Sequence, residues 1–382
     1  MNGPELEIKG ILALRGRIRP PGDKSIAHRS LLLSARAEGT SRITGLPWSQ
    51  DVVHTLEAVE ALGAEVRRRP EPDATEVSGG AGSLHRPVSS LDVGNSGTAI
   101  RLLAGFVSPF PWLTHLHGDA SIARRPMDRV VDPLRLMGAG VDGRENGRFP
   151  PLAIAGGRLR GIDYTPPIAS AQVKSAILLA GLGAEGETVV REPMVTRVHT
   201  EEMLAGCGAN VEVSSQGGGQ VVRVRPSRLE PFELAIPGDP SQAAFWVVAA
   251  CIVPGSDVVV ENVYVGPARA GYLDVLTRMG AEVEMVKKTA TTGDISARYG
   301  PLRATEVGGS EIPGVIDEIP VLSVAAAVAE GTTTFKEVAE LAVKESNRLA
   351  TVESELSSLG IEVETGPDSL VVHGGALKGG PT

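Results

Sequence analysis

The chain has 382 residues, of which 42% are hydrophobic and 22% charged, and its net charge is −9 with an isoelectric point near 5.4. This composition is typical of a soluble globular protein with room for two domains, and it argues against a general nucleic-acid or membrane-surface binder. The sequence has no basic start followed by an apolar segment and no run of 18 apolar residues, so we expect a cytoplasmic protein without a membrane span.

The first predicted helix begins near residue 24, in the stretch PGDKSIAHRSLLL (21–33). Pro21 and Gly22 form a turn, Asp23 can cap the helix, and Lys24 then lies in the first helical turn. A cation at the positive end of a helix dipole is unfavourable unless an anion binds beside it. The stretch therefore indicates either an anion site or an ordinary solvated helix start.

An amphipathic helix that ends in glycine and leads into a strand recurs five times along the chain. The segments are 56–66, 134–141, 203–213, 273–285 and 352–364, and their glycines are Gly63, Gly138, Gly208, Gly280 and Gly360. Glycine suits this place because it adopts the left-handed conformation that closes many helices. The glycines are 75, 70, 72 and 80 residues apart, which indicates a duplicated α/β unit.

Each unit begins near an almost wholly apolar helix, such as 99–107, 175–182, 242–253 or 321–329. These helices lack a polar face over several turns, so we expect them to be buried on most sides. A sixth unit is expected about one interval after Gly360, beyond Thr382. The repeat thus predicts an architecture that is incomplete within this chain.

Two further stretches carry polar residues that could hold an anion. In LDVGNSGTAIRLLAGF (91–106), the small loop from Gly94 to Thr98 can present backbone N–H groups to a phosphate or carboxylate, or simply cap the helix. It matches neither the Walker A pattern nor GxGxxG. In GDASIARRPMDRVVDPL (118–134), Arg124 or Arg125 could form a bidentate contact with such an anion, although surface arginines are common.

The next polar cluster lies at the start of the helix in PPIASAQVKSAILLAGL (166–182). Ser170, Gln172, Lys174 and Ser175 could form the floor of a polyol site, and the alternative is simple helix capping. The nearby stretch 195–202 adds Arg197 and His199, and we assign no catalytic role to His199. The two cysteines, Cys207 and Cys251, lack metal-ligand spacing, and we expect both to be reduced core residues.

The C-terminal part contains the pattern that most resembles acid–base chemistry. Asp317 directly precedes an almost wholly apolar helix, and Lys344, Glu345 and Arg348 follow within two turns of each other. Lys344 and Arg348, at i and i+4, are expected to share one helical face. Charges beside apolar helices often have displaced pKa values, as acid–base catalysis requires, but a capping carboxylate and a surface ion-pair cluster would give the same pattern.

Eight stretches in this order resemble the 5-enolpyruvylshikimate-3-phosphate synthase family, from about residue 8 to residue 374. They read PGDKSIAHR, LDVGNSGTAIRLLAG, GDASIARRPM, ASAQVKSAILLAGL, VTRVHTE, IPGDPSQAAF, DEIPVLSVAAAVAEG and LAVKESNRL. SAQVKSA is closest to the bacterial subgroup often called class II. The resemblance implies an α/β fold, an inside-out α/β barrel of two lobes with three copies of one unit each, of which five are recognisable here. One lobe would contain residues 1–19 and 236–382 and the other residues 20–235, with the active site in the cleft between them.

The reaction implied by the resemblance transfers the enolpyruvyl group of phosphoenolpyruvate to the 5-hydroxyl of shikimate 3-phosphate and releases phosphate. The catalytic residues would be Asp317 as general base, with Glu345 and Lys24 in proton transfer at the methylene carbon. The residues implied for shikimate 3-phosphate are Lys24, Ser25, Arg29, Ser170, Ala171, Gln172, Arg197, Asp317 and Lys344. Those implied for phosphoenolpyruvate are Lys24, Asn95, Gly97, Thr98, Arg125, Gln172 and Arg348. The family implies no metal, no cofactor and a monomer, and Gly97 suggests that glyphosate inhibits the enzyme.

The chain departs from the family pattern at its end, where a DHR[IM]AM block and a lysine-bearing segment are expected but absent from the sequence. We therefore predict a truncated form with weak or no activity. Two other functions stay open. One is a non-catalytic remnant that binds shikimate 3-phosphate. The other is the related transferase that acts on UDP-N-acetylglucosamine, which typically has Lys-Asn where this chain has Lys24-Ser25.

Overall fold

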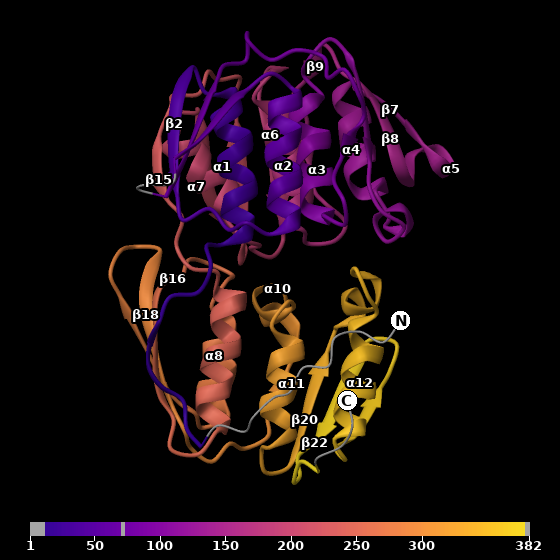
Figure 1. The fold of residues 1–382 in the computed structure, drawn as a ribbon. Coiled ribbons are helices and arrows are strands. Elements are labelled where there is room, and N and C mark those ends of the chain that lie inside the picture. The colour runs from indigo at the N-terminus through magenta and orange to yellow at the C-terminus, as the bar shows by residue number, and fades with distance from the viewer. Residues whose placement is uncertain (1–11, 70–72, 379–382) are drawn as a thin grey trace, which may run out of the picture.

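The computed structural model describes residues 12–69 and 73–378 and has two lobes, one above the other in Figure 1. The upper lobe runs from α1 (Lys24–Arg36) to β15 (Glu233–Ala235). The lower lobe contains β1 (Arg15–Ile18) and the elements from α8 (Pro240–Ile252) to β22 (Ser369–His373). The buried apolar residues form two separate clusters, one for each lobe. The outermost residues of the predicted lobe boundaries, 1–11 and 379–382, lie outside the described part of the chain.

The remaining elements of the upper lobe follow α1 in chain order. Its helices are α2 (Gln50–Ala61), α3 (Gly97–Val107), the 3-10 turn η1 (Ile122–Arg124), α4 (Asp128–Met137), the short turn α5 (Arg144–Gly147), α6 (Ala171–Gly181) and α7 (His199–Gly206). Its strands are β2 (Gly39–Thr44), β3 (Glu65–Arg69), β4 (Ala74–Gly79), β5 (Leu91–Asp92), β6 (Leu113–His117), β7 (Gly140–Gly143), β8 (Phe149–Ala155), β9 (Leu159–Arg160), β10 (Asp163–Tyr164), β11 (Ala184–Glu185), β12 (Thr188–Glu192), β13 (Val211–Gln216) and β14 (Gly219–Val224).

The lower lobe has the same kinds of element. Its further helices are α9 (Gly271–Arg278), η2 (Gly309–Glu311), α10 (Ile312–Val315), α11 (Ile319–Ala327), η3 (Ala339–Val343) and α12 (Arg348–Ser358). Its further strands are β16 (Asp257–Tyr264), β17 (Glu282–Lys287), β18 (Thr292–Arg298), β19 (Glu306–Val307), β20 (Thr332–Lys336) and β21 (Glu362–Thr365).

One four-stranded sheet recurs five times in the described part of the chain, with the orders β15-β2-β4-β3, β5-β6-β8-β7, β10-β12-β14-β13, β1-β16-β18-β17 and β19-β20-β22-β21. In every copy the first strand pairs in parallel with the second, and the other two pairings are antiparallel. Each sheet belongs to a helix–strand–helix–strand–strand unit, which confirms the predicted α/β repeat. Three units lie in the upper lobe and two in the described part of the lower lobe.

The upper lobe closes on itself through the short strand β15. This strand leaves the third unit and pairs in parallel with β2 of the first unit, Leu234 opposite Ile43. A parallel partner must come from a crossover connection, and here the crossover is almost the whole lobe. The three units therefore form a ring around α1, α3 and α6, which pack against one another in the centre (Figure 1).

The five repeated glycines adopt the conformation that the sequence predicts. Gly63, Gly138, Gly208, Gly280 and Gly360 all have φ between +75° and +108° and follow α2, α4, α7, α9 and α12. In each case a strand begins two to three residues later. A side chain is strained at such φ values, which is why glycine stands there.

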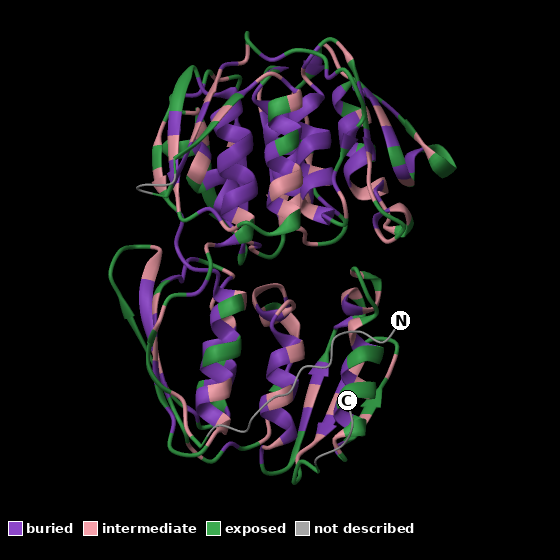
Figure 2. Cartoon of the chain, viewed as in Figure 1, coloured by how far each residue is buried: buried purple, intermediate pink, exposed green. Residues whose placement is uncertain are grey.

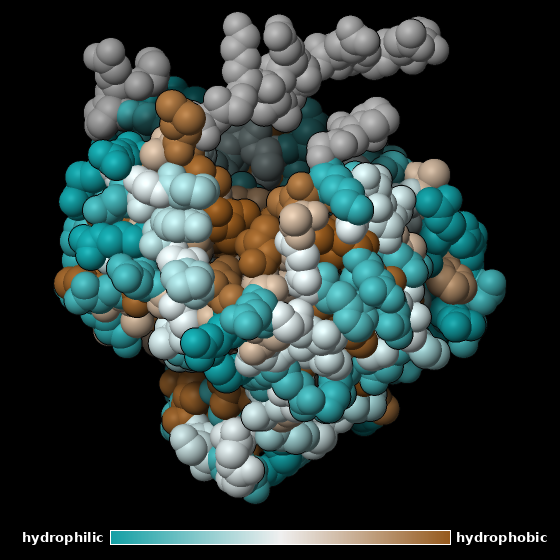
Figure 3. All heavy atoms as spheres, turned by 90° about the horizontal axis from the view of Figure 1, so that it is seen from below, coloured by the Kyte–Doolittle hydropathy of each residue, from teal (hydrophilic) through white to brown (hydrophobic). Residues whose placement is uncertain are grey.

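The apolar helices differ in how much of their surface is buried. Figure 2 shows α1 buried along most of its length, but α8 carries a regular green stripe of exposed residues. Phe245 and Trp246 of α8 are 57% and 39% exposed. α8 is thus buried on most sides, as expected, but one apolar stripe of it is exposed. Figure 3 views the molecule from below, where apolar side chains gather in a hollow with polar side chains around them.

The chain passes between the lobes twice, and the two crossings pair with each other. Asp23 donates its N–H to the carbonyl of Pro237, and Asp239 donates to the carbonyl of Pro21, both at 2.8 Å. Asp23 caps α1 and Asp239 caps α8, so each crossing ends at a helix N-terminus. None of the helices in residues 12–69 and 73–378 is long and apolar enough to cross a membrane.

Candidate active site

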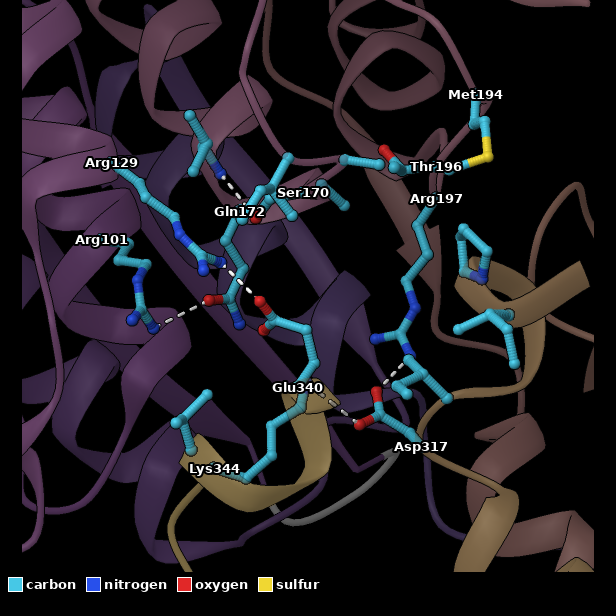
Figure 4. Close-up of a pocket in the computed structure, with 18 of the residues that line it drawn as sticks. Arg101, Arg129, Ser170, Gln172, Met194, Thr196, Arg197, Asp317, Glu340 and Lys344 are labelled. Carbon is cyan, nitrogen blue, oxygen red and sulfur yellow. Dashed lines mark hydrogen bonds and ion pairs between the residues drawn. The ribbon is translucent and has the colours of Figure 1, made fainter. Parts of the chain in front are cut away.

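A cavity of about 310 Å³ lies between the lobes and receives side chains from both (Figure 4). The upper lobe lines it with Arg101, Arg125, Arg129, Ser170, Ala171, Gln172, Thr196 and Arg197, and the lower lobe with Ile312, Ile316, Asp317, Glu340, Val343 and Lys344. Four arginines of the upper lobe line this space, so the cavity offers several cations to an anionic ligand.

Asp317 is the negative centre of the cavity. It lies in the turn 316–318 before α11, and its carboxylate accepts a hydrogen bond from Arg197 of the upper lobe and one from Arg348 at 3.0 Å. The Lys344 ammonium lies 3.7 Å away, and Figure 4 shows Arg197 approaching Asp317 from above and Lys344 from the left. Burial alone would raise the pKa of Asp317, but Arg197, Lys344 and Arg348 together hold the pKa well below its usual range. Asp317 is therefore ionised in the free protein.

Lys344 and Arg348 reach Asp317 by a different local structure from the one expected. The 3-10 turn η3 ends at Val343, residues 344–346 bend, and α12 begins only at Arg348, capped by Asn347. The prediction that the two cations share one helical face is wrong, because 344–348 is not helical. Glu345 accepts a 2.5 Å hydrogen bond from Arg348. Burial opposes ionisation of Glu345, but this bond lowers its pKa overall.

The start of α3 brings a small polar loop against an arginine. Ser96 caps α3 by accepting from Ala99 N at 3.0 Å, so Gly97 is the first helical residue. A Cβ atom on Gly97 would lie 2.5 Å from Nη1 of Arg125, which shows how closely the guanidinium covers this helix N-terminus. Burial lowers the pKa of Arg125, as expected for a cation that lacks a full set of anionic partners.

Gln172 at the start of α6 is held from two sides. Its side-chain oxygen accepts from Arg101 at 3.0 Å, and its nitrogen donates to Thr98 at 3.0 Å. Burial and the neighbouring Arg125 and Arg129 lower the pKa of Arg101 to about 9. An anion in the cavity would relieve this repulsion. Ser170 caps α6 and lines the cavity beside Gln172.

Lys174 and Ser175 do not belong to the cavity floor. Both side chains are completely buried on the side of α6 that faces the protein interior. The prediction that they join Ser170 and Gln172 in a polyol site is therefore wrong, because the α6 face that meets the cavity ends at Val173.

The two predicted cations at the start of α1, Lys24 and Arg29, lie in different environments, one partly exposed and one buried. Lys24 pairs with Asp51 of α2 at 2.6 Å, and its side chain is 47% exposed. Arg29 is only 3% exposed and donates to Thr200, Ser175 and the carbonyl of Ser25. In this structure Arg29 braces helices from within, so its predicted contact with substrate stays a prediction.

The other predicted site residues are not among those that line the cavity. Asn95 is exposed in the loop before α3, and Thr98 is half-buried beneath Gln172. Glu345 contacts the opposite lobe, since its carbonyl accepts from Ser121 at 3.2 Å. Ser25 is half-buried at the start of α1.

Sequence reasoning missed Arg101, Arg129 and Glu340. Arg101 follows Gly97 at i+4, so the helical period could have placed it over the loop. Arg129 pairs with Glu340 across the cleft at 2.8 Å. Only the arrangement of the lobes brings these two residues together, and no sequence pattern indicates the pair.

The family model for EPSP synthase (3-phosphoshikimate 1-carboxyvinyltransferase) matches residues 8–382. Among curated proteins, a 3-phosphoshikimate 1-carboxyvinyltransferase of Bacillus anthracis is 46% identical over 96% of this chain and 86% of its own length. One of Geobacillus kaustophilus is 47% identical over 95% of this chain and 85% of its own length. The chain belongs to the EPSP synthase family.

Solved structures agree with the family in fold. EPSP synthase from Acinetobacter baumannii superposes with a TM-score of 0.82 at 40% identity, over 96% of this chain and 83% of that one. The enolpyruvyl transferase NikO from Streptomyces tendae has a TM-score of 0.74 at 21% identity, which is a likeness of fold alone. The predicted enolpyruvyl transferase fold is thereby confirmed.

Proposed function

We propose that this member of the EPSP synthase family transfers the enolpyruvyl group of phosphoenolpyruvate to the 5-hydroxyl of shikimate 3-phosphate, releasing phosphate. The step belongs to the shikimate pathway of aromatic amino-acid biosynthesis. The observation that carries the proposal is Asp317, a carboxylate held between cations of both lobes. A base surrounded by displaceable cations fits a reaction between two anions.

The proposed site has two halves in the cleft between residues 20–235 and the lobe of residues 1–19 and 236–382. For shikimate 3-phosphate we propose Lys24, Ser25, Arg29, Ser170, Ala171, Gln172, Arg197, Asp317 and Lys344. For phosphoenolpyruvate we propose Lys24, Asn95, Gly97, Thr98, Arg125, Gln172 and Arg348. The positions of Arg125, Gln172, Arg197 and Lys344 around one cavity support this assignment.

The oxygen of the 5-hydroxyl attacks the central carbon of phosphoenolpyruvate, and Asp317 takes the proton of that hydroxyl. Glu345 and Lys24 deliver a proton to the methylene carbon, giving a tetrahedral ketal. That proton then leaves as the double bond re-forms and phosphate departs. In the free protein the cations keep Asp317 a weak base. Substrate anions compete for Arg197, Lys344 and Arg348, and losing these partners would raise the pKa of Asp317 towards a useful value.

We further propose a cytoplasmic monomer that needs no cofactor or metal and binds no nucleic acid. Cys207 and Cys251 are buried and unpaired, and burial raises the pKa of each thiol to about 12. Inert, reduced cysteines are compatible with a reducing compartment. Glyphosate is proposed to inhibit the enzyme, since Gly97 leaves Arg125 room to bind a small anion.

The test is phosphate release from shikimate 3-phosphate and phosphoenolpyruvate, with UDP-N-acetylglucosamine as the alternative acceptor. We expect turnover only with shikimate 3-phosphate, and inhibition by glyphosate that phosphoenolpyruvate relieves. Calorimetry with each substrate completes the experiment. Binding of shikimate 3-phosphate without turnover would show a binding protein, and turnover with the nucleotide sugar would contradict the proposed acceptor.

A further inference from the structure

Lys174 is a buried cation that the proposed reaction does not use. Its side chain is completely buried on α6, and its ammonium lies 2.7 Å from both Glu192 and Glu201. These carboxylates are 2% and 3% exposed. The Gln220 amide donates to the same two carboxylate oxygens, at 2.6 and 2.9 Å. Buried charges are costly to desolvate, so each charge of this set depends on the others as partners, and removing one leaves the rest uncompensated.

The two carboxylates stand at the two ends of one loop. Glu192 is the last residue of β12, and Glu201 lies in the first turn of α7. The residues between them carry Met194, Thr196 and Arg197 into the cavity (Figure 4). Thr196 also donates a hydrogen bond back to Glu192. Lys174 therefore closes this loop at its base as the cation shared by both ends, beside the neutral Gln220 amide.

Lys174 also ties both ends of the loop to α6, the helix that carries it. Lys174 lies one turn after Ser170, whose carbonyl accepts its N–H at 3.1 Å, and two residues after Gln172. A second connection runs in parallel: Ser175 and Thr200 contact each other at 2.6 Å, and Arg29 of α1 donates to both. The start of α6 and the 193–200 loop thus form one braced block.

We propose that Lys174 is a positioning residue for the shikimate 3-phosphate half of the site, which fixes the Arg197 loop relative to the start of α6. This rests on the proposed function. Ser170 and Gln172 come from one side of the brace and Arg197 from the other, so the Lys174–Glu192–Glu201 contacts, together with the Ser175–Thr200–Arg29 connection, fix their separation. Phosphoenolpyruvate contacts proposed for Arg125 and Arg348 lie outside the brace.

The decisive variant is Lys174→Met, which keeps the length of the side chain and removes the ammonium. Without the ammonium, the carboxylates of Glu192 and Glu201 repel each other, and we expect the loop between them, which carries Arg197, to shift. Displacements of about 1 Å can cost ~100-fold in a positioned site, so we expect KM and calorimetric Kd for shikimate 3-phosphate to rise about tenfold or more. KM for phosphoenolpyruvate should change by less than about threefold, because its proposed cations are held elsewhere.

Arg36→Met is the matched control. Arg36 is also a buried cation, 5% exposed, and it contacts α6 at the carbonyl of Leu179, at the end of the helix away from the cavity. This variant should lower the thermal midpoint without changing KM for shikimate 3-phosphate. A merely structural role of Lys174 would give the same result as Arg36→Met, and that outcome would overturn the proposal.

Glu201→Gln keeps the proposal testable if Lys174→Met does not fold. It leaves the Lys174–Glu192 pair in place and weakens one end of the brace, so we expect a smaller rise in the shikimate 3-phosphate KM, about threefold. An unchanged KM in the folded variant would count against the positioning role. Wild-type turnover is measured alongside, so failure of the proposed reaction is recognised separately from failure of the brace.

Discussion

Cations from both lobes surround the Asp317 carboxylate, and they determine the direction in which its pKa is shifted. Arg197 comes from the loop after β12 and Arg348 from the start of α12, while the side chain of Asp317 stays 24% exposed. Its folded pKa lies below the ordinary value of about 3.9. The ionised form therefore stabilises the fold at every pH above that value, and the stabilisation is lost as the pH falls through the lower folded pKa.

Asp317→Asn should destabilise the protein and abolish most of its activity. We expect the free energy of unfolding at pH 7 to fall by about 1–3 kcal/mol, since a charge-assisted set of bonds is lost. The difference from the wild type should shrink below about pH 4. Loss of the base should lower kcat by about 100-fold or more. Urea denaturation across pH and the phosphate-release assay measure both.

Asp163→Asn is the comparison for Asp317→Asn. Asp163 also has a pKa lowered by an arginine, Arg191 at 2.6 Å, but its side chain is 52% exposed and does not line the cavity. Exposed pairs contribute about 1 kcal/mol at most, and activity should be unchanged. Equal stability of Asp317→Asn and the wild type at pH 7 would contradict the role given to the cations.

The packing of α3 against α6 positions the starts of these two helices, where we propose that substrate anions bind. Gly105 of α3 permits this approach, because a Cβ atom there would lie 2.1 Å from the carbonyl oxygen of Ala176. That obstacle is backbone and cannot rotate away. Gly97 and Ser170 begin these same two helices, so their separation depends on a residue two turns away from the cavity.

Gly105→Ala should therefore destabilise the upper lobe by about 2–4 kcal/mol, since overpacking forces the helices apart. Gly206→Ala is the opposite case, because Gly206 is also helical and nothing lies within 4 Å of its added Cβ. That variant should be more stable by about 0.5–1 kcal/mol, the ordinary helix preference for alanine. Chemical denaturation of both variants checks the prediction, and equal effects of the two would contradict it.

At the scale of the whole molecule, Arg269 joins the two lobes. Its guanidinium is 2% exposed and lies 2.8 Å from Asp23, 2.9 Å from Asp239 and 3.8 Å from Glu318. Asp23 precedes Lys24 in the upper lobe, and Glu318 follows Asp317 in the lower. Burial raises the pKa of Glu318, although Arg269 opposes the rise. Arg269 thus binds the carboxylates at both chain crossings between the lobes. It also lies beside Glu318, so it contacts the sequence neighbours of both Lys24 and Asp317, two proposed catalytic residues.

Arg269→Met should cost about 3–5 kcal/mol of stability at neutral pH, because it leaves buried carboxylates without their cation. Their folded pKa values should then exceed the unfolded values, so the variant should regain stability as the pH falls towards 5. Thermal unfolding at several pH values measures this. Arg278→Met, at a site 42% exposed on α9, should change stability by less than about 0.5 kcal/mol. A pH-independent loss in Arg269→Met would exclude the proposed carboxylate effect.

The sequence by itself determined the local features of this protein. Helix caps such as Asp23, the left-handed glycines and the order of the units follow from interactions within a few residues, and so they could be predicted from the printed chain. The same local patterns placed Asp317 ahead of an apolar helix and Gly97 at a helix start, and the family motifs joined them into one expected site.

Only the tertiary structure decided which charges meet. Lys174 has the sequence character of a binding residue, yet its side chain is completely buried between two carboxylates. Arg129 pairs with Glu340 across the cleft, and α8 leaves Phe245 and Trp246 exposed. These outcomes depend on contacts between residues dozens to hundreds of positions apart. Coulomb energies and burial costs depend on distance in space, which the linear order of residues does not contain.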